Sequence, residues 1–418
     1  MKEKLKKIGW FRKTVKVIKN VLSNIYRCIR RCIVIAYLKK RRPVSNERIK
    51  VGFIAQSAGV WDKMEPVYSA LKRNEHFYTY LFVVPEDNFK TYEIKPDYEE
   101  NFFCTHYPES IKVLDNNGNC MDPKEYQVDY LFYQRPYDYR LPKMLRSSRM
   151  VQYTKCCYIP YGFVASDTFD GNNLKNEFFD NQYIMFMDSE YMKKKFIRRY
   201  PIASYIGAKQ VEYLGYPALE KYIQWGKLEN SEGYITWSPR WSFDSKNGES
   251  SFLKYKDQFL EYTKKNKGKY IFRPHPLMPV ELVDKGILTE EQWKEYIYKL
   301  ENNGVVYDVV SPIDSILRKT EILITDFSTI IGNFVMMGRP VIYCDTGVKL
   351  NPPYQEMRKC IYTVYDWENV EKICSRLQVG IDSTQSIRRS YVDQEEDSIL
   401  GASERIVDRL IADAIIAK

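Results

Sequence analysis

The apolar positions in residues 305–345 alternate between short β-branched runs and longer segments with helical spacing. Buried parallel strands joined by crossover helices produce this alternation. Pro312 suits the first turn of a helix over residues 312–320, and Gly338 ends the second helical segment. The strands that we predict here are residues 305–310, 322–324 and 341–344. This stretch therefore predicts part of a parallel sheet.

Similar apolar runs recur over most of the chain and end in polar or turn-forming residues. The further strands that we predict are residues 48–56, 78–84, 128–133, 156–159, 183–188, 211–214, 234–237 and 270–272, with a helix over 61–72. A turn at residues 215–217 separates two groups of strands, because glycine and proline interrupt regular structure. At 418 residues the chain is long enough for two domains. We therefore predict an α/β protein with two domains.

The N-terminal segment shows a different pattern, in which apolar residues recur at the third or fourth position of a long helix. This stripe comprises Leu5, Ile8, Phe11, Val15, Ile18, Leu22, Ile25, Ile29, Cys32 and Ala36. Residues 1–50 also hold 17 of the 64 Lys and Arg residues and only 2 of the 54 Asp and Glu residues. The net charge of +10 therefore belongs to this segment, and the rest of the chain, with 47 basic and 52 acidic residues, does not resemble a nucleic-acid-binding surface.

A basic amphipathic helix with Trp10 near its start is suited to the interface of an anionic membrane. Its longest apolar run, residues 32–38, is too short to span a bilayer. A coiled coil or a helix packed on the protein's own body are alternatives that the same spacing allows. We predict that residues 1–42 bind anionic lipid and place the protein peripherally on the cytoplasmic face of the cell membrane, with no nucleic acid as partner.

Charged and hydroxyl-bearing residues follow the predicted strands of the second half. The carboxyl ends of parallel strands meet at one edge of a sheet, where ligands bind in open α/β folds. The candidate residues for the donor phosphate and nucleotide are Arg240, Arg273, Thr325, Asp326, Ser328 and Thr329. His275, between two prolines at a strand end, is a candidate catalytic residue. Arginines, a histidine and a helix N-terminus together suit a diphosphate.

The first half contributes a loop at the end of the predicted strand 156–159. There Tyr161 and Gly162 are candidate acceptor-side residues, and Tyr161 is a second candidate catalytic residue. The residues 57–59 do not form the glycine-rich fingerprint of a dinucleotide site. The nine cysteines lack the paired spacing of zinc ligands, and no carboxylate cluster indicates a metal. We therefore predict neither a cofactor nor a bound metal.

Residues 211–410 resemble the CDP-glycerol glycerophosphotransferase family, whose members build teichoic acids and related glycerol- or ribitol-phosphate polymers. The motifs that carry the resemblance are Leu214-Gly215-Tyr216-Pro217, Trp237-Ser238-Pro239-Arg240, Arg273-Pro274-His275-Pro276, Leu323-Ile324-Thr325-Asp326-Phe327-Ser328-Thr329, Arg339-Pro340 and Gly401-Ala402-Ser403-Glu404-Arg405-Ile406. The resemblance implies a GT-B-like fold, in which two Rossmann-like domains with parallel sheets face a cleft and the C-terminal domain binds the donor nucleotide.

The resemblance also divides the chain and shows where it departs from the family. We predict a membrane-associating helix at residues 1–45, an acceptor-side domain at 46–215, a donor domain at 216–390 and a helical segment packed on the body at 391–418. The family's histidine before a glycine in the acceptor-side domain, proposed as the catalytic base, is replaced here by Tyr161. Asn333 and Phe327 stand where the family has Asp and Tyr.

The resemblance implies an enzyme that transfers glycerol phosphate or ribitol phosphate from a CDP-linked donor and releases CMP. Its acceptor would be lipid-linked or a growing polymer, in the synthesis of a teichoic acid or capsule-like surface polymer. One alternative is a GT-B glycosyltransferase that uses a sugar nucleotide in surface polysaccharide synthesis. The other is an inert, membrane-tethered assembly protein, which the loss of the family's histidine keeps open.

Overall fold

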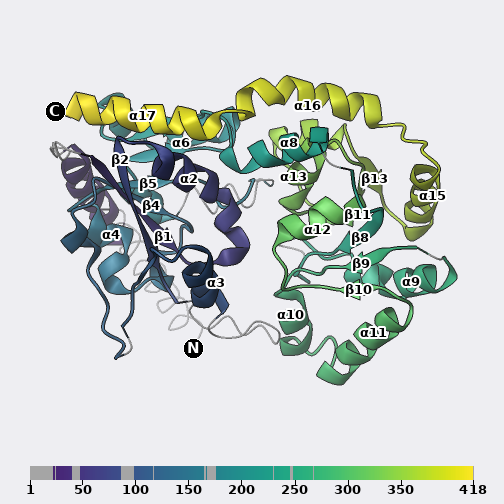
Figure 1. Cartoon of the computed structure of the whole chain (residues 1–418). Coiled ribbons are helices and arrows are strands. Elements are labelled where there is room, and N and C mark those ends of the chain that lie inside the picture. Colours follow the sequence, from purple (N-terminus) through teal and green to yellow (C-terminus); the bar gives the residue numbers. More distant parts are fainter. Residues whose placement is uncertain are drawn as a thin grey trace, which may run out of the picture.

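The structure is a computed structural model that describes residues 22–23, 25–39, 48–85, 98–115, 117–163, 166, 176–228, 230–244, 248–266 and 268–417. Two α/β bodies lie side by side, and the last two helices run along the same side of both (Figure 1). Much of the predicted N-terminal helix, including Trp10, lies outside the described residues. The two bodies are described over most of their length, and they are treated in turn below.

The N-terminal body contains, in the described residues, a sheet of seven strands in the order β3-β2-β1-β4-β5-β6-β7. These are β1 (Ile49–Ala55), β2 (Phe77–Val83), β3 (Ile111–Lys112), β4 (Tyr130–Tyr133), β5 (Lys155–Tyr158), β6 (Ile184–Phe186) and β7 (Gln210–Glu212). All neighbouring pairs are parallel. A Cβ on Gly52 would lie 2.8 Å from Phe82 and 2.9 Å from Leu131, so glycine is needed for these side chains to pack over β1.

The C-terminal body contains a sheet whose six strands, counted over the described part of the chain, follow the order β10-β9-β8-β11-β12-β13. These are β8 (Tyr234–Ser238), β9 (Tyr270–Phe272), β10 (Val306–Tyr307), β11 (Thr320–Thr325), β12 (Val341–Cys344) and β13 (Tyr362–Val364). The strands β9, β8 and β11 pair in parallel as predicted. Since β8 lies between the other two, the residues that follow these three strands share one edge of the sheet.

Helices surround both sheets (Figure 1). Those of the N-terminal body are α2 (Glu65–Arg73), α3 (Tyr98–His106), α4 (Ser147–Met150), α6 (Glu190–Arg199) and α7 (Pro201–Tyr205). The following ones are α8 (Glu220–Leu228), α9 (Phe252–Lys265), α10 (Met278–Asp284), α11 (Glu290–Asn302), α12 (Ile313–Lys319), α13 (Ile330–Met336), α14 (Pro352–Arg358) and α15 (Trp367–Gln378). Short 3-10 helices are η1 (Ala58–Lys63), η2 (Pro123–Tyr126), η3 (Asp138–Arg140), η4 (Lys143–Leu145), η5 (Glu177–Asn181) and η6 (Pro217–Leu219).

The helices α16 (Gln385–Ile399) and α17 (Ala402–Ala417) lead from the C-terminal body back to the N-terminal one (Figure 1). The buried carboxylate of Asp413 fixes α17 there. It accepts hydrogen bonds from Lys155 Nζ at 2.6 Å, Tyr130 Oη at 2.6 Å and Tyr183 Oη at 2.8 Å. Because these donors come from β4, β5 and the residue before β6, the last helix is tied directly to the first sheet.

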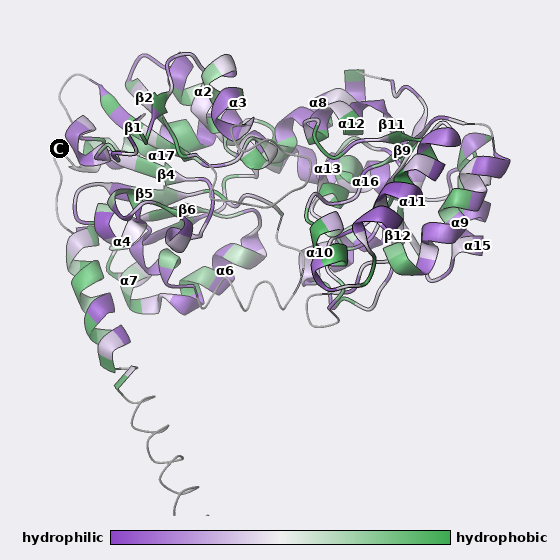
Figure 2. Ribbon diagram, turned by 90° about the horizontal axis from the view of Figure 1, so that it is seen from below, coloured by the Kyte–Doolittle hydropathy of each residue, from purple (hydrophilic) through white to green (hydrophobic). Residues whose placement is uncertain are grey.

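The described part of the N-terminal helix, residues 22–23 and 25–39, contacts the N-terminal body with one face. On that face Val34 and Leu38 are buried, and Arg30 pairs with Glu177 at 3.0 Å and Asp180 at 3.1 Å. The large apolar residues exposed along the described helix are Leu22, Ile25, Tyr26, Ile29 and Ile33. Figure 2 shows its first described turns standing clear of the body. Among the described residues no helix is both long and apolar enough to cross a bilayer.

The structure corrects two predicted elements and adds two strands. The helix predicted over 61–72 is divided, because α2 starts anew at Glu65 with a proline in its first turn. The strand predicted over 305–310 is limited to β10, since Asp308 Oδ1 accepts the backbone N–H groups of Val310 and Ser311 and turns the chain. The strands β3 and β13 were not predicted because they are short edge strands with few apolar residues.

Candidate functional site

Arg240, His275 and the loop 325–329 follow β8, β9 and β11, and together they form a rim at the carboxyl edge of the C-terminal sheet. The N-terminal body contacts this rim. A Cβ on Gly162 would lie only 3.0 Å from Thr329 Cγ2. Phe163, next in the chain, packs against Tyr354 with ring centroids 5.4 Å apart. The predicted acceptor-side and donor-side loops therefore meet, although they come from different bodies.

Arg240 is held on the rim by the loop that follows β11. Its backbone N–H donates to Asp326 Oδ2 at 3.0 Å, and its guanidinium carbon lies 4.9 Å from the centre of the Phe327 ring. Burial lowers the pKa of Arg240, although the nearby Asp326 carboxylate opposes this shift. The Nε and Nη1 atoms are buried and, within the described residues, have no hydrogen-bond partner. A buried guanidinium with unused donors is suited to bind an anion.

His275 follows β9 and donates its backbone N–H to the carbonyl of Pro239 at 3.0 Å. Its Nδ1 accepts the backbone N–H of Leu277 at 3.1 Å, so the neutral ring carries its proton on Nε2. The surrounding protein desolvates the imidazole, and Arg240 and Arg273 add positive charge, which together lower the pKa of His275 to about 4. The residue nevertheless keeps an exposed surface. A bound anion would therefore raise this pKa again.

Arg273 lies beside His275 but uses its terminal nitrogens within the protein. Its Nη1 donates to Asp308 Oδ1 at 3.0 Å, and its Nη2 donates to the carbonyl of Ser311 at 2.7 Å. Asp308 in turn accepts the backbone N–H of Ser311 at 2.9 Å. These bonds leave Nε–H and further Nη–H donors of the guanidinium, so the direct contact of Arg273 with the donor phosphate stays a prediction. We assign Arg273 to holding the 308–311 turn beside β9.

Asp326 and Thr325 are buried, and their side chains bind other protein groups. Asp326 accepts hydrogen bonds from the backbone of Arg240 and Ser251 and from both the Ser250 and Ser251 hydroxyls. Thr325 Oγ1 donates to the carbonyl of Ser238 at 2.7 Å. Both side chains are thus engaged within the protein, and the predicted nucleotide contacts of these residues stay a prediction. Asp326 brings the loops after β8 and β11 together, which positions Arg240.

Ser328 and Thr329 lie at the start of α13. The backbone carbonyl of Ser328 accepts the Tyr354 hydroxyl at 2.7 Å, and its side-chain oxygen accepts the N–H of Ile330 at 3.4 Å. Thr329 is exposed, and in the described structure its hydroxyl does not cap the helix. Of the three predicted hydroxyl groups, those of Ser328 and Thr329 lie nearer the surface, whereas Thr325 is buried.

Tyr161 is joined to a second tyrosine on the acceptor side. The hydroxyl oxygens of Tyr161 and Tyr137 are 2.6 Å apart, and their rings meet edge to face at 5.9 Å. Burial, together with Tyr137, raises the pKa of Tyr161 well above its ordinary value. The phenol therefore stays protonated at neutral pH, and a role as general base does not fit. Tyr161 is suited instead to position other groups by hydrogen bonding.

The segment after β4 carries Tyr137, Tyr139 and Arg140 close to Tyr161, and none of these three was among the predicted site residues. One pattern could have found it. Arg135 and Pro136 follow a predicted strand in the same way as the arginine and proline pairs after β8 and β9. A cation and a proline at the carboxyl end of a strand therefore mark this part of the acceptor side as well.

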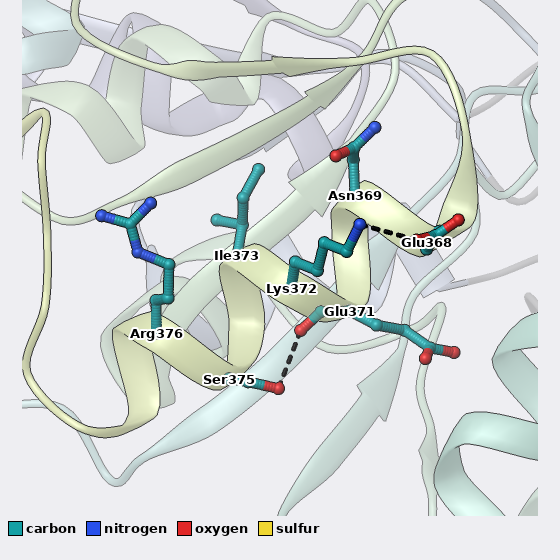
Figure 3. A pocket seen from close by; sticks show the side chains of 7 residues that line it. All are labelled: Glu368, Asn369, Glu371, Lys372, Ile373, Ser375 and Arg376. Atoms are coloured by element: carbon teal, nitrogen blue, oxygen red, sulfur yellow. Dashed lines mark hydrogen bonds and ion pairs between the residues drawn. The ribbon is translucent and has the colours of Figure 1, made fainter.

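We also considered metal sites and surface depressions among the described residues. Over the described ranges, no group of three or more His, Cys, Asp or Glu side chains is placed to hold a metal ion. A surface depression on α15 is lined by side chains of that helix alone, with Lys372 paired to Glu368 at 2.6 Å (Figure 3). Because it shares no residue with the rim, we do not connect it with the site.

The part of the chain that contains the rim matches the model of a known protein family. Residues 178–375 match the model of the family described as CDP-Glycerol:Poly(glycerophosphate) glycerophosphotransferase. This match confirms the predicted resemblance and, with it, an enzyme of glycerophosphotransferase type. No curated protein sequence matches the chain.

Comparison with solved structures identifies the fold. The wall teichoic acid polymerase TagF shares 16% identity, with 97% of this chain and 98% of that chain covered and a TM-score of 0.53. A TagF variant soaked with CDPG shares 14% identity, with 98% of each chain covered and a TM-score of 0.53. UDP-GlcNAc 2-epimerase from Neisseria meningitidis, bound to UDP-GlcNAc, shares 13% identity, with 87% of this chain and 100% of that chain covered and a TM-score of 0.54. The predicted GT-B-like α/β fold is confirmed.

Proposed function

We propose that this protein transfers a polyol phosphate from a CDP-linked donor to an acceptor hydroxyl and releases CMP, starting from the match of residues 178–375 to the glycerophosphotransferase family. The matched stretch contains Arg240, His275 and the loop 325–329. The observation that carries the proposal is the guanidinium of Arg240, whose buried Nε and Nη1 lack a partner among the described residues. A diphosphate brings the acceptor atoms that these donors need.

In this reaction the acceptor oxygen forms a bond to the phosphorus that carries the polyol, and the bond from that phosphorus to the CMP oxygen breaks. Most of the catalysis in such a transfer comes from positioning and from stabilising charge on the phosphate oxygens. Arg240 supplies positive charge next to the diphosphate. His275 presents its Nε2 proton to the leaving CMP phosphate, and its pKa rises when the anion binds. The acceptor's proton goes to solvent.

The acceptor that we propose is lipid-linked or a growing surface polymer, reached at the cytoplasmic face of the membrane. The N-terminal helix supports this part of the proposal. Its buried face, with Val34 and Leu38, is already used against the body, whereas Leu22 is 60% exposed and Ile29 is 56% exposed. An apolar stripe that the body leaves open, on a segment rich in Lys and Arg, is suited to anionic lipid.

The experiment that tests the proposal measures CMP release from CDP-glycerol and CDP-ribitol, and UMP or UDP release from UDP-GlcNAc, with a glycerol-phosphate-primed lipid as acceptor. We expect CMP release that needs the acceptor and that His275→Ala and Arg240→Gln abolish. Excess EDTA should leave the rate unchanged, because cationic side chains stabilise the phosphate charge in this scheme.

Two other results would favour the alternatives. Release of UMP or UDP from the sugar nucleotide alone would identify a glycosyltransferase. Binding of donors with no release of either nucleotide would identify an assembly protein.

A further inference from the structure

The 3-10 helix η3 and the residue before it place two tyrosines and an arginine on one turn after β4. Tyr139 is 68% exposed. The guanidinium carbon of Arg140 lies 5.6 Å from the centre of the Tyr139 ring and 5.7 Å from that of Tyr137. Its Nε donates to the Tyr139 hydroxyl at 3.4 Å. Aromatic rings with an adjacent guanidinium form a surface for a ligand that has both C–H groups and negative charge.

The turn is held rigidly from below. The carboxylate of Asp138 accepts the backbone N–H of Ser147 at 2.8 Å and the Ser147 hydroxyl at 2.6 Å. The side-chain amide of Asn181 donates to the same hydroxyl at 2.9 Å, and that of Asn176 donates to the carbonyl of Pro136 at 2.7 Å. Because these bonds fix the backbone of the turn, a ligand that binds there needs to order little backbone.

A short series of contacts connects the turn with the rim. The Tyr137 hydroxyl lies 2.6 Å from that of Tyr161, and Tyr161 precedes Gly162 in the chain. A Cβ on Gly162 would lie 3.0 Å from Thr329 in the donor-side loop. The surface formed by Tyr139 and the residues beside it therefore lies on the acceptor side of the reaction centre, beyond the Tyr137–Tyr161 pair.

We propose that Tyr137, Tyr139 and Arg140 form an acceptor subsite for a chain of polyols linked by phosphodiesters. In this subsite Arg140 binds a phosphodiester of the chain, and the tyrosine rings pack against the C–H groups of a polyol. The subsite holds units that precede the reacting hydroxyl. This inference rests on the proposed function, since it concerns the acceptor of the same transfer.

The test uses direct binding to the full chain, with synthetic tri(glycerol phosphate) as the probe and isothermal titration calorimetry at low and high salt. We expect Arg140→Gln to weaken binding about tenfold and to reduce its salt dependence, because a charge-assisted hydrogen bond is lost. Tyr139→Ala should weaken binding about fivefold through the loss of ring packing. All variants should bind CMP as wild type does and keep its melting temperature.

Matched controls come from the α6 and α7 surface, where Arg198 is exposed and Tyr205 is 92% exposed. Arg198→Gln and Tyr205→Ala should bind the probe as wild type does. Equal affinity of Arg140→Gln and Arg198→Gln would overturn the subsite, as would wild-type protein that does not bind the probe. If maltotriose, which is uncharged, bound as tightly as tri(glycerol phosphate), the proposed recognition of a phosphodiester charge would be wrong. Probe binding that depends on Arg140, without CMP release from CDP-glycerol, would contradict the proposed function and support the subsite.

Discussion

Arg240 and Arg273 occupy similar positions after neighbouring parallel strands, yet their side chains have different surroundings. Arg273 is engaged by Asp308 and by the carbonyl of Ser311. The guanidinium of Arg240 stacks on Phe327 and keeps two buried donors without a partner in the described structure. An unsatisfied buried donor costs about 1–3 kcal/mol, so it is retained where a ligand completes it. The two arginines therefore form a matched pair for separating binding from folding.

Replacing each arginine by glutamine should separate these roles. We expect Arg240→Gln to weaken CDP-glycerol binding about tenfold or more, with little change in the free energy of unfolding. Arg273→Gln should lower the free energy of unfolding by about 3 kcal/mol, because Asp308 loses its cation, and should affect binding less. Titration calorimetry and urea unfolding measure the two effects. If Arg273→Gln weakened CDP-glycerol binding and Arg240→Gln lowered the free energy of unfolding instead, Arg273 would be the phosphate ligand.

His275 should respond to both pH and donor. Its pKa of about 4 in the fold lies below the value of about 6.5 for a free histidine, so the unfolded state binds the proton more tightly. Stability should therefore fall as the pH falls from about 6.5 to 4, and His275→Gln should make this fall smaller.

Donor binding should reverse the shift, because the diphosphate stabilises the imidazolium. The affinity for CDP-glycerol should then rise as the pH falls below neutral. The chain has three histidines, so His275→Gln identifies the His275 resonance in a proton NMR titration. A His275 resonance whose pKa stays the same after saturation with CDP-glycerol would place the donor elsewhere.

At the scale of elements, the N-terminal helix combines two functions on different faces. Arg30, Val34 and Leu38 contact the body, whereas Ile25, Ile29 and other apolar residues of the stripe remain exposed. The predicted stripe is therefore not the face that packs on the protein. An exposed apolar face of this kind needs another partner, and lipid accounts for both the apolar residues and the basic charge.

Replacing Ile25, Ile29 and Ile33 together by glutamine should abolish binding to anionic vesicles without unfolding the protein. Burial of each such side chain contributes about 1.5–3 kcal/mol, so the loss in partitioning should exceed a factor of ten. Vesicle sedimentation measures it, and higher salt should weaken binding of the wild type. The control is the pair Leu228→Gln and Val379→Gln, which removes exposed apolar residues elsewhere. Equal sedimentation of both variants would exclude the helix as the membrane contact.

At the scale of the whole molecule, two motifs far apart in the sequence meet where the chain passes between the bodies. Arg405 donates from Nε to the carbonyl of Leu214 at 2.8 Å and from Nη1 to that of Leu400 at 2.8 Å. Glu220 accepts the N–H and the hydroxyl of Ser403 at 2.9 and 2.6 Å. These contacts join α8 to the junction of α16 and α17. The two bodies are thus connected at both crossings of the chain.

Gly215 is the tightest point of this junction. Its φ of +89° suits glycine, and a Cβ there would collide with the carbonyl oxygen of Ser398. Gly286 has a similar φ of +64° but open space around it. Gly215→Ala should therefore lower the free energy of unfolding by about 1–3 kcal/mol more than Gly286→Ala does, as overpacking typically costs. Urea unfolding of both variants checks this. Equal decreases in the free energy of unfolding would show that the backbone near Ser398 shifts to make room for the added methyl group.

The sequence by itself determined the parallel sheets and the edge at which the site lies. Runs such as 341–344 are apolar throughout because both faces of the strand are buried, and such runs identify central strands without knowledge of their partners. Parallel pairing then brings the residues after each strand to one edge. Arg240 and His275 could therefore be placed together before their contacts were known.

Only the tertiary structure decided which side chains remain available at that edge. Arg273 and Asp326 have the residue types of ligands, but groups 35 and 75 positions away, Asp308 and Ser251, engage them. Likewise the hydrogen bond of Tyr161 to Tyr137, and the face with which the N-terminal helix docks, depend on segments distant in sequence. A local pattern encodes burial and direction of the chain, whereas the pairing of polar groups is set by the three-dimensional packing of the whole molecule.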